Sequence, residues 1–237
     1  MNQKRMFRVV FTAFLLVTCV LCGTALAQDK VQDEESLLTL INYGGGIGYF
    51  TIFLNFVGMG FVIEHFINIR REVLMPPEVV QQIEQLFEEG EYEEAMAICE
   101  SRPTHFTRVI GAALPKIGTG FENIKSAAQS AHEGEATKLF QKIGHINFIA
   151  NIAPSLGLFG TVWGMMFAFS VIAHSATPPT PAELAGGIQQ AIVTTVIGLA
   201  VNIPLSGFFY FFRYKVIRLS DDVGSAAMDL LDRFREQ

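Results

Sequence analysis

The chain has 237 residues, of which 50% are hydrophobic and 17% are charged, and its formal net charge at pH 7 is −6. This length allows one or two domains, and the mean hydropathy of +0.35 is high for a soluble protein. An acidic balance without a dense basic run argues against a nucleic-acid partner. Composition therefore favours a membrane protein.

The N-terminus has the pattern of a secretory signal peptide over residues 1–27. A basic start is followed by an apolar run at residues 9–21 and by the small-x-small cleavage site Ala25-Leu26-Ala27. The alternative is an uncleaved first membrane anchor. Cleavage would leave residues 28–45 as an N-terminal segment outside the cytoplasm.

Three membrane-spanning helices are expected, at residues 46–69, 146–173 and 184–212. The second and third segments contain no Asp, Glu, Lys or Arg, and each exceeds the roughly 20 apolar residues that cross a bilayer. At 1.5 Å per residue they would run roughly 42 Å, so they should tilt or protrude from the hydrocarbon core. The fold class expected is therefore an all-α membrane protein.

Basic residues near the helix ends predict the topology, because Lys and Arg accumulate on the cytoplasmic side. The loop at residues 174–183 has no Lys or Arg, which predicts that it is periplasmic. Residues 70–145 and the helical tail at 213–237 are then cytoplasmic. A cleaved signal peptide requires the same arrangement. The basic flanks are Arg70, Arg71, Lys138, Lys142, Arg213, Lys215 and Arg218.

The cytoplasmic segment is expected to be helical and acidic. Apolar spacing predicts helices at residues 77–89, 92–100, 106–118 and 121–141. The last is expected to continue into the second span as a helix of some 50 residues, broken only near Gly144 or Pro154. The many glutamates between positions 72 and 100 are interpreted as a solvated face.

The sequence carries no pattern of enzymatic chemistry. Walker, Rossmann and catalytic-triad patterns are absent, and the histidines show no metal-ligand spacing. Removal of Cys19 and Cys22 with the signal peptide would leave Cys99 as a lone cysteine, which we expect to be inert. We therefore expect no enzyme activity, no cofactor and no metal.

The second and third spans each present one narrow stripe of small and neutral polar residues at 100° per residue. Small residues let helix backbones approach closely in a membrane, so tight packing is one interpretation. The other is that the polar members line a narrow hydrated path, since polar groups in hydrocarbon face protein or water. The stripes are Gly157, Thr161, Gly164 and Ala168, and Gly187, Ala191, Thr195, Gly198 and Asn202.

Two runs carry a resemblance to a known family. APSLGLFGTVWGMMFAF, a short loop and LAGGIQQAIVTTVIGLAVNIP resemble the paired signature of the MotA/TolQ/ExbB proton-channel family over about residues 144–214. The resemblance implies that Thr161 and Thr195 are pore threonines. Gln190 departs from it, because ExbB-like relatives often carry glutamate at this place.

The candidate site residues form two sets. The residues expected to line a proton pathway are Thr161, Thr194, Thr195, Asn202 and Gln190. The residues expected to pack the helices are Pro154, Gly157, Gly160, Gly164, Gly187, Ala191, Gly198 and Pro204.

The resemblance also implies a function and partners. Because neither span carries a group that titrates near pH 7, a proton needs an acid from elsewhere. The family implies a ring of five copies around an ExbD- or TolR-like single-span partner with an intramembrane aspartate, and a TonB- or TolA-like periplasm-spanning protein. Three spans fit the TolQ/ExbB layout of a bacterial inner-membrane energiser. A non-conducting scaffold, a secondary transporter, a sodium-driven subunit, and a gliding or flagellar stator relative are the alternatives.

Overall fold

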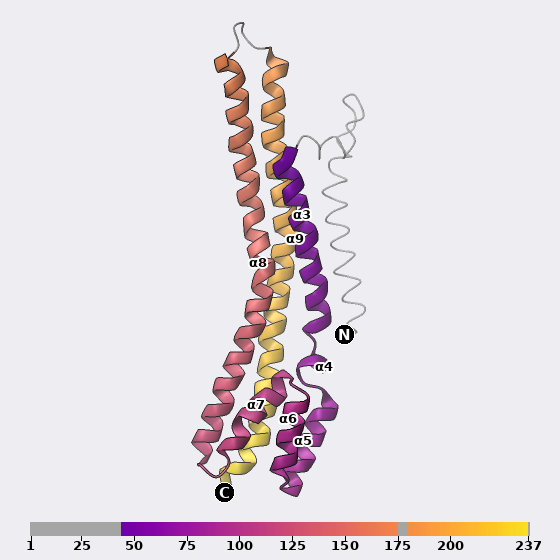
Figure 1. The fold of residues 1–237 in the computed structure, drawn as a ribbon, viewed down its shortest axis with the longest axis vertical. Helices are drawn as coiled ribbons and strands as arrows, with labels where there is room; N and C mark the ends of the chain where they lie inside the picture. The colour runs from indigo at the N-terminus through magenta and orange to yellow at the C-terminus, as the bar shows by residue number, and fades with distance from the viewer. Residues whose placement is uncertain (1–43, 175–179, 237) are drawn as a thin grey trace. The chain divides into compact units, whose positions relative to one another are not determined.

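The computed structural model describes residues 44–174 and 180–236, and their regular elements are all helices. The longest are α3 (Gly45–Asn68), α8 (Phe121–His174) and α9 (Pro181–Leu231) (Figure 1). All three are long and apolar enough to cross a membrane. The expected all-α membrane fold is therefore confirmed. The signal peptide, nearly all of the segment 28–45 and the middle of the loop 174–183 lie outside the described residues.

Shorter helices follow α3. They are α4 (Arg71–Leu74), α5 (Pro77–Glu89), α6 (Tyr92–Ser101), α7 (His105–Ala113) and the 3-10 turns η1 (Leu114–Lys116) and η2 (Asp232–Glu236). The helix expected at residues 106–118 is shorter than predicted. It starts one residue earlier because Thr104 caps it, accepting a hydrogen bond from the Thr107 amide at 3.2 Å. It ends early because Pro115 cannot donate to the α-helical ladder, and the chain tightens into η1.

The α8 helix is continuous over 54 residues, so the expected break near Gly144 or Pro154 is wrong. Proline inside a helix removes one backbone donor, here the one that would serve the carbonyl of Ala150. The side-chain amide of Asn202 on α9 donates to that carbonyl instead, at 2.7 Å. The lost hydrogen bond is thereby replaced and the helix does not break.

The described residues divide into two compact units. The first unit comprises residues 44–61, 146–174 and 180–208, and the second comprises residues 62–145 and 209–236. The helices α3, α8 and α9 each contribute a part to both units.

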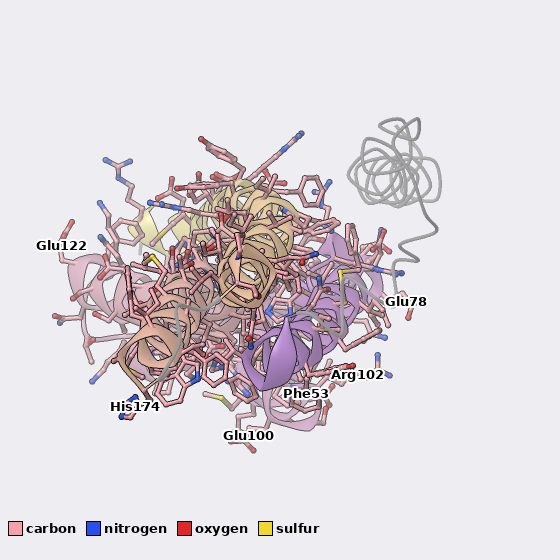
Figure 2. The ribbon with its side chains drawn as sticks, turned by 90° about the horizontal axis from the view of Figure 1, so that it is seen from above. Phe53, Glu78, Glu100, Arg102, Glu122 and His174 are labelled. Carbon is pink, nitrogen blue, oxygen red and sulfur yellow. The ribbon has the colours of Figure 1, made fainter. Side chains whose placement is uncertain are left out.

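Along the contact between α8 and α9, the first unit has small residues inside, and many of its large apolar residues are exposed. On α8, Ala153 and Ala168 are buried, whereas Phe159 and Trp163 are about half exposed. On α3, Phe53 is 60% exposed and points outward (Figure 2). An apolar exterior over a small-residue interior is the arrangement expected of helices surrounded by lipid.

The second unit has the opposite arrangement, with large apolar side chains inside. Its core combines residues from α5, α7 and α9 and from the segment that follows α3, while carboxylates such as Glu78, Glu100 and Glu122 point outward (Figure 2). The acidic outer face expected of this segment is therefore present. Fully buried members of the core are Ile69, Ile83, Phe106, Ile110, Phe212, Val216 and Leu231.

Candidate functional site

The glycines of the first unit lie where α8 and α9 touch through their backbones. A methyl group added at Gly198 would lie 2.6 Å from the carbonyl oxygen of Ala153. One added at Gly164 would lie 2.8 Å from the carbonyl oxygen of Gly187. Such distances are shorter than any side-chain carbon tolerates, so only glycine permits this approach. The two stripes expected from the sequence thus face one another.

Thr161 of α8 and Thr195 of α9 meet within this contact, with their hydroxyl groups hydrogen-bonded to each other. Thr161 Oγ1 also lies 3.0 Å from the carbonyl oxygen of Gly157 and 3.3 Å from that of Ala191. Thr195 Oγ1 lies 3.2 Å from the same Gly157 oxygen across the helices. Both residues are half-buried, so the described residues do not fully enclose the pair.

Thr194, the neighbour of this pair, has a different position. It is 2% exposed, and its hydroxyl donates to the carbonyl of Ala191 at 2.8 Å on its own helix. A methyl group added at Gly160 would lie 2.5 Å from Thr194 Oγ1. Thr194 therefore fills the space that Gly160 leaves, and its hydroxyl faces protein.

Asn202 contributes a third polar contact between α8 and α9. Its amide donates to the Ala150 carbonyl that Pro154 leaves without a backbone donor. A buried carbonyl without a partner costs about 1–3 kcal/mol, so this contact joins the two helices by satisfying a defect in one of them. Pro204 lies inside α9, half-buried.

Gln190 lies apart from the threonine pair, toward the start of α3. A methyl group at Gly45 would lie 2.6 Å from Gln190 Nε2, and Gly45 has φ +55°, which favours glycine. Further along the same helices, the side chain of Leu205 occupies the notch at Gly58, 2.8 Å from where a methyl carbon would be. These α3–α9 contacts were not predicted, because periodicity assigns a residue to a face without naming its neighbour.

The chemistry available at the site is that of neutral hydrogen-bonding groups. Hydroxyl and carbonyl oxygens can hold water and hydrogen-bond a carboxylate, but they do not change protonation state near pH 7. The described residues contain no group of three or more His, Cys, Asp or Glu placed to hold a metal ion. Burial, and secondarily the charge of Glu100, raises the pKa of the Cys99 thiol to about 11, so thiolate chemistry is disfavoured there.

Comparison with known proteins identifies relatives of this chain. The family model described as "MotA/TolQ/ExbB proton channel family" matches residues 94–224. A putative biopolymer transport protein ExbB homolog of Methanothermobacter thermautotrophicus is 27% identical over 190 residues, covering 79% of this chain and 66% of that protein. The Tol-Pal system protein TolQ of Haemophilus influenzae is 32% identical over 42% of this chain and 43% of its own length.

The biopolymer transport protein ExbB of Salmonella typhimurium is 36% identical over 37% of this chain and 36% of its own length. These matches thus span about a third to two thirds of the relatives. Among solved structures, that of C. jejuni MotAB superposes with a TM-score of 0.51 at 17% identity, over 96% of this chain and 88% of that one. The last similarity concerns the fold alone. Since the family model matches more than half of the residues, the chain belongs to the MotA/TolQ/ExbB proton channel family.

Proposed function

We propose that this chain is the channel-forming subunit of an inner-membrane energiser of the ExbB–ExbD or TolQ–TolR type. It would couple a proton gradient to transport or mechanical work in the cell envelope. The observation that carries the proposal is the threonine pair Thr161–Thr195, which is hydrogen-bonded within a backbone-to-backbone contact of α8 and α9 and is only half-buried. Membership of the family supports it.

The proposed mechanism divides the work between this chain and a partner. Residues 146–173 and 184–212 carry no Asp, Glu, Lys or Arg, so these segments hold no carboxylate that could bind a proton in transit. A single-span ExbD- or TolR-like protein would supply an intramembrane aspartate. The hydroxyls of the threonine pair would hold water and hydrogen-bond that carboxylate in its charged form, favouring release of the proton.

Assembly and cargo follow from the same proposal. Large apolar side chains on the exterior of the first unit suit contact with lipid and with further copies of the chain, in a ring that the family resemblance makes a pentamer. A TonB- or TolA-like protein would transmit the mechanical force across the periplasm. Gln190, where relatives often have glutamate, would leave proton transfer more dependent on the partner's aspartate.

The proposed topology follows the one-sided basic flanks. The mature N-terminus and the loop at residues 174–183 would be periplasmic, and residues 70–145 and the C-terminus cytoplasmic. A single cysteine placed at Ala176 should react with an impermeant reagent in right-side-out inner-membrane vesicles, and one at Glu91 should not. The reverse labelling pattern would contradict this orientation.

The main alternative is a non-conducting scaffold, in which the small-residue contact serves only assembly. The same proton-conducting chemistry could also drive a gliding or flagellar stator, and neutral oxygens suit Na⁺ as well as water. Proton conduction is favoured over the scaffold because the family to which the chain belongs is described as a proton channel family. Repeating the flux measurement described below with a sodium gradient identifies the ion that is conducted.

The proposal is tested by proton flux into vesicles that contain this chain and its single-span partner. Thr195→Val keeps the side-chain shape and removes the hydroxyl. Loss of a buried hydrogen bond of about 1–3 kcal/mol at the barrier would slow flux by about one to two orders of magnitude. Adding Thr161→Val should deepen the loss while the oligomer, checked on the same sample, is unchanged.

The matched control is Thr137→Val on the same helix. Thr137 also donates to the carbonyl four residues earlier, at 2.8 Å from Glu133, but it belongs to the second unit and is exposed. Its removal should leave flux at the wild-type rate. Wild-type flux from the Thr161→Val, Thr195→Val double variant would rule out the threonine path and favour the scaffold.

A further inference from the structure

Two histidines and a serine form a hydrogen-bonded row inside the second unit. Nε2 of His105 on α7 lies 3.3 Å from Nδ1 of His132 on α8, and Nε2 of His132 lies 3.4 Å from Oγ of Ser220 on α9. The His132 ring fits against α9 because residue 224 is glycine, where a methyl carbon would lie 3.0 Å from the imidazole. This row, the histidine junction, connects three helices.

The histidine junction has room for only one proton between its two imidazoles. Of two facing ring nitrogens, one must donate and the other must accept. His105 Nδ1 is buried without a hydrogen-bond partner in the described structure. The assignment that avoids a buried N–H there has His105 Nε2 donating to His132, and His132 Nε2 donating to Ser220 Oγ. Both rings are then neutral.

A further proton has no favourable place on this row. On His132 Nδ1 it would face the N–H of His105. On His105 Nδ1 it would create a buried donor with no acceptor, which opposes the closed arrangement. Protonation and the closed junction are therefore mutually exclusive.

Burial, more than the surrounding charges, acts in the same direction by lowering the pKa of His105. Burial first, then His132, and then Arg108 of α7 lower the pKa of His105 to about 4, although Glu135 of α8 opposes them. Burial disfavours the charge of Glu135, but hydrogen bonds from Lys138 and Arg108 outweigh it and hold the pKa of that carboxyl below its usual value. Three further carboxylates border the same pocket as His132, namely Glu133 of α8 and Asp221 and Asp229 of α9.

Solvent can reach the junction without unfolding of the unit. An open pocket of about 540 Å³ is lined by His132 together with Gln129, Glu133, Asp221 and Ser225. Protons from the surrounding water can therefore arrive at His132. Ser220 itself is 4% exposed, which argues against its serving as a nucleophile toward an outside substrate.

We propose that the histidine junction is a proton-binding site that works as a clamp. In its neutral state it would hold α7 against α8 and α9, and binding of a proton from the solvent would release α7. Its physiological meaning rests on the proposed function, because a channel that delivers protons to the cytoplasm would then loosen its own cytoplasmic bundle as that compartment acidifies. The clamp itself depends on no partner and no flux.

The direction and size of the pH effect follow from linkage. The released state has the ordinary histidine pKa of 6.5, and the closed state has a pKa of about 4 for His105. The closed state is therefore fully favoured above pH 6.5 and loses stability as the pH falls toward 4. One unit below 6.5, at pH 5.5, the equilibrium for release should be about tenfold larger than at neutral pH.

The test is hydrogen exchange of α7 amides in the full-length protein in lipid nanodiscs at pH 7.5 and 5.5. Time courses are scaled to the intrinsic exchange rate at each pH. Protection of α7 should fall about tenfold relative to α5, which contains no histidine. His105→Gln should abolish the fall, and His145→Gln, an exposed histidine of α8, should leave it unchanged.

Two results would overturn the proposal. One is equal α7 protection at both pH values in the wild type, and the other is the same fall in His105→Gln. If that variant does not fold, the pH dependence of the His105 ring-carbon signals in NMR spectra of the wild type provides the test. If His105 titrates near pH 6.5 while the α7 amides remain protected from exchange, the clamp proposal is contradicted. None of these readouts measures flux, so failure of the clamp is distinguishable from failure of the channel.

Discussion

The two units of this chain pack by opposite means. In the first unit, glycine, alanine and threonine line the α8–α9 contact, and the distances across it leave no room for one more methyl group at Gly198 or Gly164. In the second unit, large side chains such as Phe106 and Phe212 are completely buried and the carboxylates point outward. The first unit is therefore sensitive to addition of atoms and the second to their removal.

We attribute the difference to the surroundings proposed for each unit, lipid for the first and water for the second. In water, burial of apolar surface drives association, so the largest side chains lie inside. In lipid that force between helices is missing, and close backbone approach with interhelical hydrogen bonds replaces it. Substitutions that separate these two modes test whether each unit has the surroundings proposed for it.

The largest loss of stability is expected when a buried side chain of the second unit is truncated. Phe106→Ala removes a side chain that is 0% exposed and leaves a cavity, which should lower the free energy of unfolding by about 3–5 kcal/mol. Thermal unfolding of the full chain in detergent, followed by circular dichroism, measures the change. Phe140→Ala is the matched control, because Phe140 is 37% exposed and its loss should cost markedly less. Equal losses would mean that the bundle has no packed core.

A smaller loss of stability is expected when a methyl group is added to the first unit. Gly198→Ala places a methyl carbon 2.6 Å from the Ala153 carbonyl oxygen, so α8 and α9 must move apart. Overpacking of this kind lowers stability by about 1–3 kcal/mol. Gly207→Ala on the same helix has no heavy atom within 4 Å and should be neutral or stabilising by up to about 1 kcal/mol. Destabilisation by both alanines alike would indicate a backbone effect and not a close contact.

The most specific of these effects, similar in size to that of Gly198→Ala, concerns Asn202. Asn202→Leu leaves the Ala150 carbonyl without a donor and should lower stability by about 1–3 kcal/mol. Pro154→Ala restores the backbone N–H that would serve this carbonyl. In the double variant, the loss due to Asn202→Leu should therefore shrink. A double-mutant cycle by thermal unfolding measures the coupling, and additive losses would contradict this role of Asn202.

The sequence predicted the features that depend on local pattern. Apolar runs located the three long helices, and the spacing of small residues located the faces on which Thr161 and Thr195 meet. Two features escaped because each joins residues far apart in sequence. The Asn202 amide reaches the carbonyl of Ala150, 52 residues earlier in the chain, so a break was expected near Gly144 or Pro154 where α8 is continuous. His105, His132 and Ser220 are 27 and 88 residues apart, and scattered histidines carry no spacing signal.

The hydrogen bond between Asn202 and Ala150 also has a consequence for biosynthesis. The ribosome makes α8 before α9, so an α8 that entered the bilayer alone would expose to hydrocarbon a carbonyl that no residue of its own helix can serve. An unsatisfied backbone group there costs several kcal/mol. The two helices are therefore expected to leave the translocon as a hairpin.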